Sequence, residues 1–398
     1  MTTLRGRRQL LLGMGAALVA GALDGCTAGL TNSRDTKNPR PTLALTRLRA
    51  TPDMITRITV CTRPFRAQGP RIEVEQIGSS TIVHNYGHGG SGWSLSWGSS
   101  SIAAELAMRA GQREIAVIGC GALGITSALL LQRAGARVTI YAKELPPNVR
   151  SSLATGVWSP DSRICLQESA TPSFKRLWET MARRSFDTYQ TLIGLPNNPV
   201  EFFDSYLVKN TRDAGFRAAQ PADPRPKFAE LERELISDLS PRPEDYGPGS
   251  HPFGNRHVSR DSLMMFNINA YSRMLVAEFL ANGGRIEVQE FQTPADFAKL
   301  PQKALINATG YGARALFDDR SIVPVRGQVA RMAPQPGVNY GLFYNGFAFV
   351  PRRDGFVFQV VGDSDYYGFN DDSTIPSRAE AELAVNTIAG LFNPLGLS

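Results

Sequence analysis

The sequence predicts an α/β protein with a parallel dinucleotide-binding sheet and a second, antiparallel sheet. Three observations predict it. A GxGxxG motif at Gly119–Gly124 lies between an apolar run and a helical stretch. Helical and strand-like segments alternate through residues 172–320, and residues 322–362 combine strand formers with turn signals. A length of 398 residues exceeds what one core usually fills, so we expect two intertwined domains.

The elements around the motif form one βαβ unit. Residues 114–118 (EIAVI) suit a buried parallel strand, residues 125–134 a helix that stops at Gly135, and residues 137–141 (RVTIY) the next strand. This context predicts a Rossmann-type domain. Further helices are expected at about residues 93–110, 173–193, 268–282 and 377–392.

The composition excludes several classes of protein. It is ordinary for a globular chain, with 42% hydrophobic and 20% charged residues. Residues 1–25 contribute +2 to the formal charge of +7, and the remaining basic residues are scattered singly. Nucleic acid is therefore not an expected partner.

The first residues predict targeting. Arg7 and Arg8 precede an apolar stretch at residues 10–23, as in a twin-arginine leader, and this stretch is too short for an ordinary spanning helix. Leu23–Cys26 resembles a lipoprotein cleavage box, so residues 1–26 are interpreted as a signal and residues 27–55 as a tether. We expect export to the periplasm or envelope. Cys26 either carries a lipid that attaches the protein to the membrane or is an ordinary cysteine near the cleavage site.

The remaining cysteines predict neither a disulfide framework nor a zinc site. Cys61, Cys120 and Cys165 are odd in number and lack CxxC spacing. His84 and His88 stand at i and i+4, but His251 and His257 have no matching motif, so no metal is expected.

The GxGxxG motif assigns a role to each glycine. Gly119 allows a tight turn, Gly121 lets the backbone approach a pyrophosphate, and Gly124 permits close packing of helix on strand. The pyrophosphate would lie at the helix N-terminus, beside Ala122 and Leu123. Glu144, after Lys143 at the end of the second strand, is the expected ribose ligand, with a solvated surface carboxylate as the alternative.

A second glycine-rich segment, residues 84–98 (HNYGHGGSGWSLSWG), precedes a helical stretch. Glycines there are expected to bring backbone N–H groups close to a planar ligand. This segment resembles the flavin-binding signature of the D-amino acid oxidase family. Further similarity lies in residues 63–66, 69–75, 151–158, 307–310, 324–328 and 351–355, and it extends over about residues 56–398.

The resemblance implies FAD as cofactor and the oxidation of a D-amino acid or related amine to an imine, which hydrolyses to a 2-oxo acid and ammonia. O2 or another acceptor would reoxidise the flavin. Arg63 would bind the substrate carboxylate; the alternative is a strand arginine that pairs with a structural acid. Tyr206 would lie near the substrate; the alternative is a tyrosine in the core or at the rim of the pocket. With the motif residues above, the implied cofactor-binding set comprises His88, Gly89, Gly90, Gly92, Trp93, Ser94, Ser151, Ser152, Gly156, Asn307, Thr309 and Gly310.

The order of segments departs from that family. There the Arg–Pro strand and the HNYGHGG loop close the chain, whereas here they precede the GxGxxG motif, which is the pattern of a circular permutation. We therefore expect Ser398 near the start of the strand at Arg57–Cys61. The expected FAD-binding parts are residues 56–160 and 301–330, and the substrate parts are mainly residues 161–300 and 331–398.

Two further departures concern activity. Asn267 stands where relatives tend to have Glu, and residues 356–359 (FVFQ) stand where a Gly-Gly pair is expected and would narrow the pocket. An envelope flavin-binding protein with little or redirected activity is therefore the alternative to an enzyme. An NAD-dependent dehydrogenase is a third hypothesis, which the segment at residues 84–98 opposes.

Overall fold

The computed structural model describes residues 42–210 and 224–393. The expected leader, Cys26, the first part of the expected tether and Ser398 lie outside the described residues. Among the described residues, no helix has both the length and the apolar character required to cross a bilayer.

The smaller sheet has the strand order β2-β3-β10-β4-β5-β9. Its neighbours run parallel except β2 and β3, which form a hairpin. The strand bounds are Arg71–Ile77 (β2), Ser80–Tyr86 (β3), Ala304–Asn307 (β10), Glu114–Ile118 (β4), Arg137–Ala142 (β5) and Arg285–Val288 (β9). Because parallel strands end at the same edge, the loops after β3, β4, β5 and β10 meet there.

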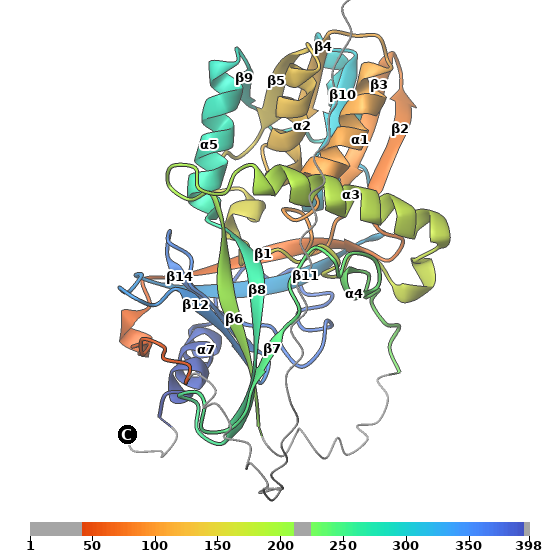
Figure 1. Ribbon diagram of the computed structural model, residues 1–398. Helices are drawn as coiled ribbons and strands as arrows, with labels where there is room; N and C mark the ends of the chain where they lie inside the picture. The colour runs from red at the N-terminus through yellow and green to blue at the C-terminus, as the bar shows by residue number, and fades with distance from the viewer. Residues whose placement is uncertain (1–41, 211–223, 394–398) are drawn as a thin grey trace, which may run out of the picture. The chain divides into compact units, whose positions relative to one another are not determined.

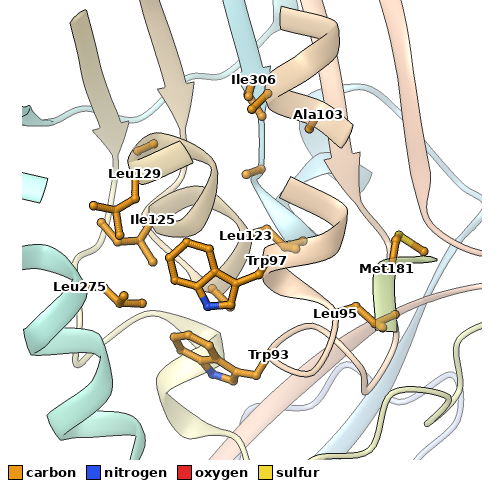
Figure 2. Close-up of a cluster of buried hydrophobic side chains, with 14 of the residues drawn as sticks. Trp93, Leu95, Trp97, Ala103, Leu123, Ile125, Leu129, Met181, Leu275 and Ile306 are labelled. Atoms are coloured by element: carbon orange, nitrogen blue, oxygen red, sulfur yellow. The ribbon is translucent and has the colours of Figure 1, made fainter. Parts of the chain in front are cut away.

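Helices α1 (Ser96–Met108) and α2 (Ala122–Arg133) pack on this sheet (Figure 1). Helix α3 (Pro172–Gln190) packs on α1, and α5 (Ile268–Ala281) packs on α2. Figure 2 shows Trp93 and Trp97 beside side chains of α2 and Leu275 of α5. Gly98 lets α1 approach α3 closely, since a Cβ there would lie 2.1 Å from Met181 O. The predicted βαβ unit and these helices are confirmed, with ends shifted by a few residues.

The larger sheet has the strand order β1-β11-β14-β13-β12-β6-β8-β7. Every neighbouring pair whose register is resolved is antiparallel except β12 with β6. The strand bounds are Arg57–Arg66 (β1), Ile322–Met332 (β11), Phe356–Val360 (β14), Phe347–Val350 (β13), Tyr340–Tyr344 (β12), Val200–Asn210 (β6), Arg256–Phe266 (β8) and Glu244–Tyr246 (β7). Helix α7 (Arg378–Gly390) packs on this sheet and buries its own core cluster.

Short helical turns connect these elements. They are η1 (Pro52–Met54), η2 (Arg150–Leu153), η3 (Gln167–Ser169), α4 (Glu232–Leu235), η4 (Pro294–Lys299), η5 (Gly310–Gly312) and α6 (Ala313–Leu316).

Two expectations about organisation need correction. Residues 42–55 are not a loose tether: Leu48 is 2% exposed in the core cluster under α7, and Tyr340 Oη donates to Thr46 O at 2.6 Å. Leu43, Leu45, Leu48 and Ala50 of this segment are turned inward, with exposed residues between them. The two sheets also do not follow the expected sequence ranges, because β1 and β11 belong to the larger sheet while β9 belongs to the smaller one.

Candidate active site

The loops at the carboxyl edge of the smaller sheet and one face of the larger sheet enclose a cavity of about 640 Å³. This volume is typical of sites for cofactors and other small molecules. The glycine-rich segment around His88 and the turn at Gly121 both line it, which confirms that these loops converge. We call this space the flavin cavity, after the cofactor that the sequence resemblance implies.

Most of the predicted site residues line the flavin cavity. These are Arg63, His88, Gly89, Gly90, Gly92, Trp93, Ser94, Gly119, Gly121, Ala122, Leu123, Lys143, Glu144, Ser151, Gly156, Thr309 and Gly310. Four predicted residues do not line it: Gly124, Ser152, Asn307 and Tyr206.

The turn after β4 has the geometry that a dinucleotide needs. Gly119 has a φ of +108°, and a Cβ there would lie 2.6 Å from Ala308 O. Gly124 lies behind the cavity, where a Cβ would be 2.0 Å from Gly119 O, so its place is in helix–strand packing. At Gly121 an added Cβ would meet only Ser151 Oγ, at 3.3 Å, and the backbone therefore faces the cavity.

The loop after β3 differs in part from expectation. The amides of Gly89 and Gly90 do not face a ligand, because they donate to Pro64 O and Ser162 O, each at 2.9 Å. A Cβ at Gly89 would lie 1.9 Å from Arg163 O, so this glycine admits a neighbouring loop. The amides of residues 92–94, which line the cavity just before α1, have no protein acceptor within the described chain. An acceptor atom of a ligand is favoured there.

His88 supplies a second open position. Its Nε2 pairs with Ser99 Oγ at 2.8 Å, while its buried Nδ1 has no hydrogen-bond partner among the described residues. Burial, followed by the charge of Arg66, lowers the pKa of His88 to about 3, so the ring is neutral. A buried ring nitrogen is costly to leave unpaired, and a cofactor polar group would satisfy it.

These features fit a flavin dinucleotide. The turn at residues 119–123 would hold its pyrophosphate, and Glu144 lines the side of the cavity where the adenosine ribose is expected. The free amides of residues 92–94 and the His88 ring would hold the flavin end. Trp93 Nε1 donates to Ser151 O at 2.8 Å, which fixes one cavity loop against the other.

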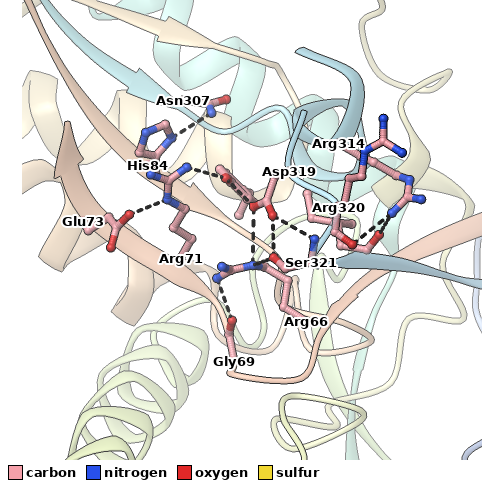
Figure 3. A network of polar contacts seen from close by, with 12 residues as sticks. Arg66, Gly69, Arg71, Glu73, His84, Asn307, Arg314, Asp319, Arg320 and Ser321 are labelled. Atoms are coloured by element: carbon pink, nitrogen blue, oxygen red, sulfur yellow. Dashed lines mark hydrogen bonds and ion pairs between the residues drawn. The ribbon is translucent and has the colours of Figure 1, made fainter. Parts of the chain in front are cut away.

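A polar network that includes His84 and Asn307 lies beneath the strand ends of the smaller sheet's loops and is drawn in part in Figure 3. His84 Nδ1 accepts from Asn307 Nδ2 at 3.0 Å, and His84 Nε2 pairs with Glu75 at 2.8 Å. Asn307 Oδ1 in turn accepts from Thr309 N at 3.2 Å and so shapes the loop that lines the cavity. His84 therefore has a structural partner on each nitrogen. Within residues 42–210 and 224–393, no group of three or more His, Cys, Asp or Glu side chains is placed to hold a metal ion.

Arg63 lies at the end of the flavin cavity formed by the larger sheet. Its Nη1 donates to Arg326 O at 3.1 Å, and no acidic side chain of the described residues pairs with it. A Cβ at Gly327 would lie 2.4 Å from Arg63 Nη1, so the glycine makes room for the guanidinium. The alternative of an arginine held by a structural acid thus finds no partner acid among the described residues.

Sequence reasoning missed a second cation beside Arg63. Arg163 lines the same cavity and donates from Nε to Asp365 O at 2.6 Å. Burial, followed by the charge of Arg63, lowers its pKa to about 10. No motif in the sequence marks Arg163, which follows the 151–158 segment without any glycine pattern.

Tyr206 does not reach the flavin cavity, which corrects its expected place near the substrate. Side chains alternate along β6, and Phe203 and Ser205 line the cavity. Tyr206 therefore points to the opposite face, where it is 2% exposed and packs against Tyr340 in the cluster under α7. It is a core tyrosine.

The two departures thought to impair activity have structural explanations. Phe356 and Phe358 point away from the flavin cavity into the cluster under α7, so they do not narrow it. Gln359 does line the cavity and pairs with Thr155. Asn267 donates to Asn198 O and Glu201 and accepts from Arg353 N at 2.8 Å, which joins three segments.

A dinucleotide cradle on one sheet, facing an arginine on the other that forms no ion pair with the described residues, defines a two-sheet protein of the dinucleotide-dependent oxidoreductase class. Comparison with known families gives the particular family. The family described as "DAO: FAD dependent oxidoreductase" matches residues 114–396. The chain belongs to this family, and FAD is its cofactor.

Curated relatives agree with this family. A D-amino-acid oxidase of Dictyostelium discoideum is 28% identical over 218 residues, covering 54% of this chain and 55% of that protein. A D-amino-acid oxidase of Rubrobacter xylanophilus is 27% identical over 272 residues, covering 67% of this chain and 74% of that protein. The chain thus matches about half of the first relative's length and about three quarters of the second's.

Among solved structures, iminodiacetate oxidase from Chelativorans sp. BNC1 aligns with a TM-score of 0.49 and 17% identity. The alignment covers 71% of this chain and 80% of that one.

Proposed function

We propose that this protein oxidises the amine of a D-amino acid or a related amine, giving an imine that hydrolyses to a 2-oxo acid and ammonia. The observation that carries the proposal is the Arg63 guanidinium, which lines the same cavity as the dinucleotide cradle and has no acidic partner among the described residues. A planar guanidinium can bind a carboxylate through two parallel hydrogen bonds. Such a contact would hold an amino acid by its carboxylate, with its Cα directed toward the flavin end.

The residues of the chain supply binding and orientation. FAD, when bound, supplies a two-electron acceptor for the hydride that leaves the substrate Cα. His88 stays neutral, so it places no positive charge at the flavin end of the cavity. A protein base is not required at the Cα–H when the substrate amine binds in its neutral form. Phe203, Leu342 and Phe349 of the larger sheet line the cavity and present apolar surface to a substrate.

The test is anaerobic reduction of the purified flavoprotein. D-amino acids are expected to bleach the flavin absorbance while L-isomers do not, and admission of air then tells O2 from another acceptor. If no amine bleaches the flavin of a coloured protein, the enzyme proposal is wrong, and a flavin-binding protein of little activity remains.

Arg63→Ala is expected to weaken substrate binding roughly 10- to 100-fold, because it removes a charge-assisted hydrogen-bond pair. Bound FAD should be retained, and Arg63→Lys, which keeps the charge without the planar fork, should fall between. If Arg63→Ala lost FAD binding as strongly as substrate binding, the role of Arg63 would be structural.

We also propose that the segment order is a circular permutation of the family arrangement. Two findings support it. The family match begins at Glu114, the first residue of β4, and leaves the preceding strand and glycine-rich loop outside it. Asn393, the last described residue, contacts Arg47, while Arg378 of α7 donates to Pro52 O at 2.6 Å.

We further propose that the protein is exported by the twin-arginine route. We also propose that a lipid on Cys26 attaches it to the membrane. Cell fractionation of the native chain and of a variant with Arg7→Lys and Arg8→Lys tests export. Labelling with a fatty acid, compared between the native chain and Cys26→Ala, tests attachment.

A further inference from the structure

A second cavity lies on the other side of η2 from the flavin cavity. Its volume is about 730 Å³, and it shares no lining residue with the flavin cavity. Ser151 lines the flavin cavity, whereas the next residue, Ser152, lines this one. The other walls come from the start of β1, the end of β11, the first turns of α5 and the turn before β14. We call it the rear cavity.

The rear cavity is strongly cationic. Arg57, Arg273, Arg331 and Arg353 line it, against the single carboxylate of Asp354. Asp354 is already neutralised by Arg352, with Nη2 and Oδ2 2.5 Å apart, and Arg353 is paired with Glu201 at 2.8 Å. The other three arginines form no ion pair within the described chain.

The rear cavity also collects unsatisfied donors. Ser152 Oγ, Ser272 Oγ and Arg331 Nη1 are buried and have no hydrogen-bond partner among the described residues. Ser152 and Ser272 are each only 3% exposed. Burial and the neighbouring charge of Arg352 lower the pKa of Arg331 to about 10, against the opposing charge of Asp354, so this guanidinium is still charged at neutral pH.

We propose that the rear cavity binds a phosphorylated small molecule. The three unsatisfied groups come from η2, α5 and β11, and all three can donate hydrogen bonds. A phosphoryl group presents three or more acceptor oxygens in different directions, which suits donors from three separate elements better than the two coplanar oxygens of a carboxylate do. Arg57 and Arg273, which are exposed, would hold further negative charge at the opening.

The proposed ligand would also contact the support of the flavin loop. Since Ser151 Oγ accepts from Ala122 N at 3.1 Å, a ligand on Ser152 acts on the residue beside the dinucleotide turn. Binding is therefore expected to shift the visible spectrum of the bound flavin slightly. This inference concerns a separate cavity and does not depend on which substrate is oxidised.

Calorimetry of the FAD-loaded protein with inorganic pyrophosphate tests the proposal, because bound FAD blocks the other phosphate-binding turn. Sodium chloride keeps the ionic strength constant, and malonate serves as the carboxylate probe. We expect saturable binding of pyrophosphate and weaker binding of malonate. No saturable binding at millimolar pyrophosphate, or equal binding of malonate, would overturn the proposal.

Variants locate the binding. Arg331→Gln and Ser272→Ala each remove a buried hydrogen-bond donor, and each should weaken pyrophosphate binding. The loss should be roughly tenfold or more for Arg331→Gln, because it also removes a charge. Ser272 lies in helix α5, which tolerates alanine, so Ser272→Ala still tests the site if Arg331→Gln fails to fold. Arg285→Gln removes an exposed arginine on β9 and should change nothing. Equal weakening by Arg285→Gln would show nonspecific charge attraction and refute the site.

Discussion

At the scale of single residues, two glycines of one loop have opposite surroundings. Gly89 has a φ of +55° and would place a Cβ 1.9 Å from Arg163 O, whereas a Cβ at Gly92 would meet nothing within 4 Å. Gly89 therefore serves packing, and Gly92 leaves space in the flavin cavity.

We expect Gly89→Ala to lower the free energy of unfolding by about 1–3 kcal/mol, because the backbone is strained and the carbonyl must move. Gly92→Ala should leave stability unchanged but weaken FAD binding. Urea unfolding and flavin titration of both variants provide the measurement. A stable Gly89→Ala variant would contradict the packing role.

His88 makes folding sensitive to acid. Its pKa in the folded protein is about 3, below the ordinary value, so the unfolded chain takes up the proton first. The stability contribution of the neutral ring is complete above pH 6.5 and is lost as the pH falls from there toward 3. Relative to His88→Gln, the native protein should lose up to about 1.4 kcal/mol per pH unit across this window. Parallel pH curves for both proteins would refute it.

At the scale of elements, the turn between β13 and β14 anchors a cavity loop. Arg352 is 0% exposed, pairs with Asp354 and donates to Ala154 O at 2.9 Å, beside residues that line the flavin cavity. Asp354 also accepts from Asn269 N, near the start of α5, at 2.9 Å. One buried ion pair thus joins the hairpin, the loop and the helix.

Arg352→Leu is expected to cost about 3–5 kcal/mol, because it leaves a buried carboxylate without its partner. Combining it with Asp354→Leu should recover part of this loss, since no buried charge remains unpaired. Denaturant unfolding of the single and double variants gives the comparison. A single variant that loses less than the double would contradict the argument.

The elements that sequence could predict are those with strong local signals. The βαβ unit combines apolar runs, glycines and a helix stop, and all of them appear in the structure. Tyr206 could not be placed, because the face of a strand residue depends on a register that only tertiary packing sets. Arg163 carries no local signal, and the alternation of apolar residues at 43–50 is short and is interrupted at Thr46–Arg47, so the burial of neither could be predicted.

At the scale of the whole molecule, the permutation proposal predicts that the chain can be reordered. A chain that runs from Gln112 to the C-terminus and then, through a flexible linker, from residue 42 to Gly111 should fold and bind FAD. The opening falls in an exposed loop between α1 and β4, and the joined segments already contact each other.

Circular dichroism and flavin binding measure this outcome. A chain opened inside β11 at Gly327, where the ladder with β1 would be cut, is the control expected to fail. Failure of the first chain alongside a folded native protein would refute the proposed order.

The internal ties of the loop around His88 bear on how the protein acquires its cofactor. Gly89 N and Gly90 N are already bound to Pro64 O and Ser162 O, and Ser91 Oγ donates to Ser162 O at 3.1 Å. The loop thus owes its shape to the polypeptide alone, and little conformational entropy is lost when FAD enters. The apoprotein should therefore keep the loop around His88 in place, and addition of FAD should restore the holoprotein without a refolding step.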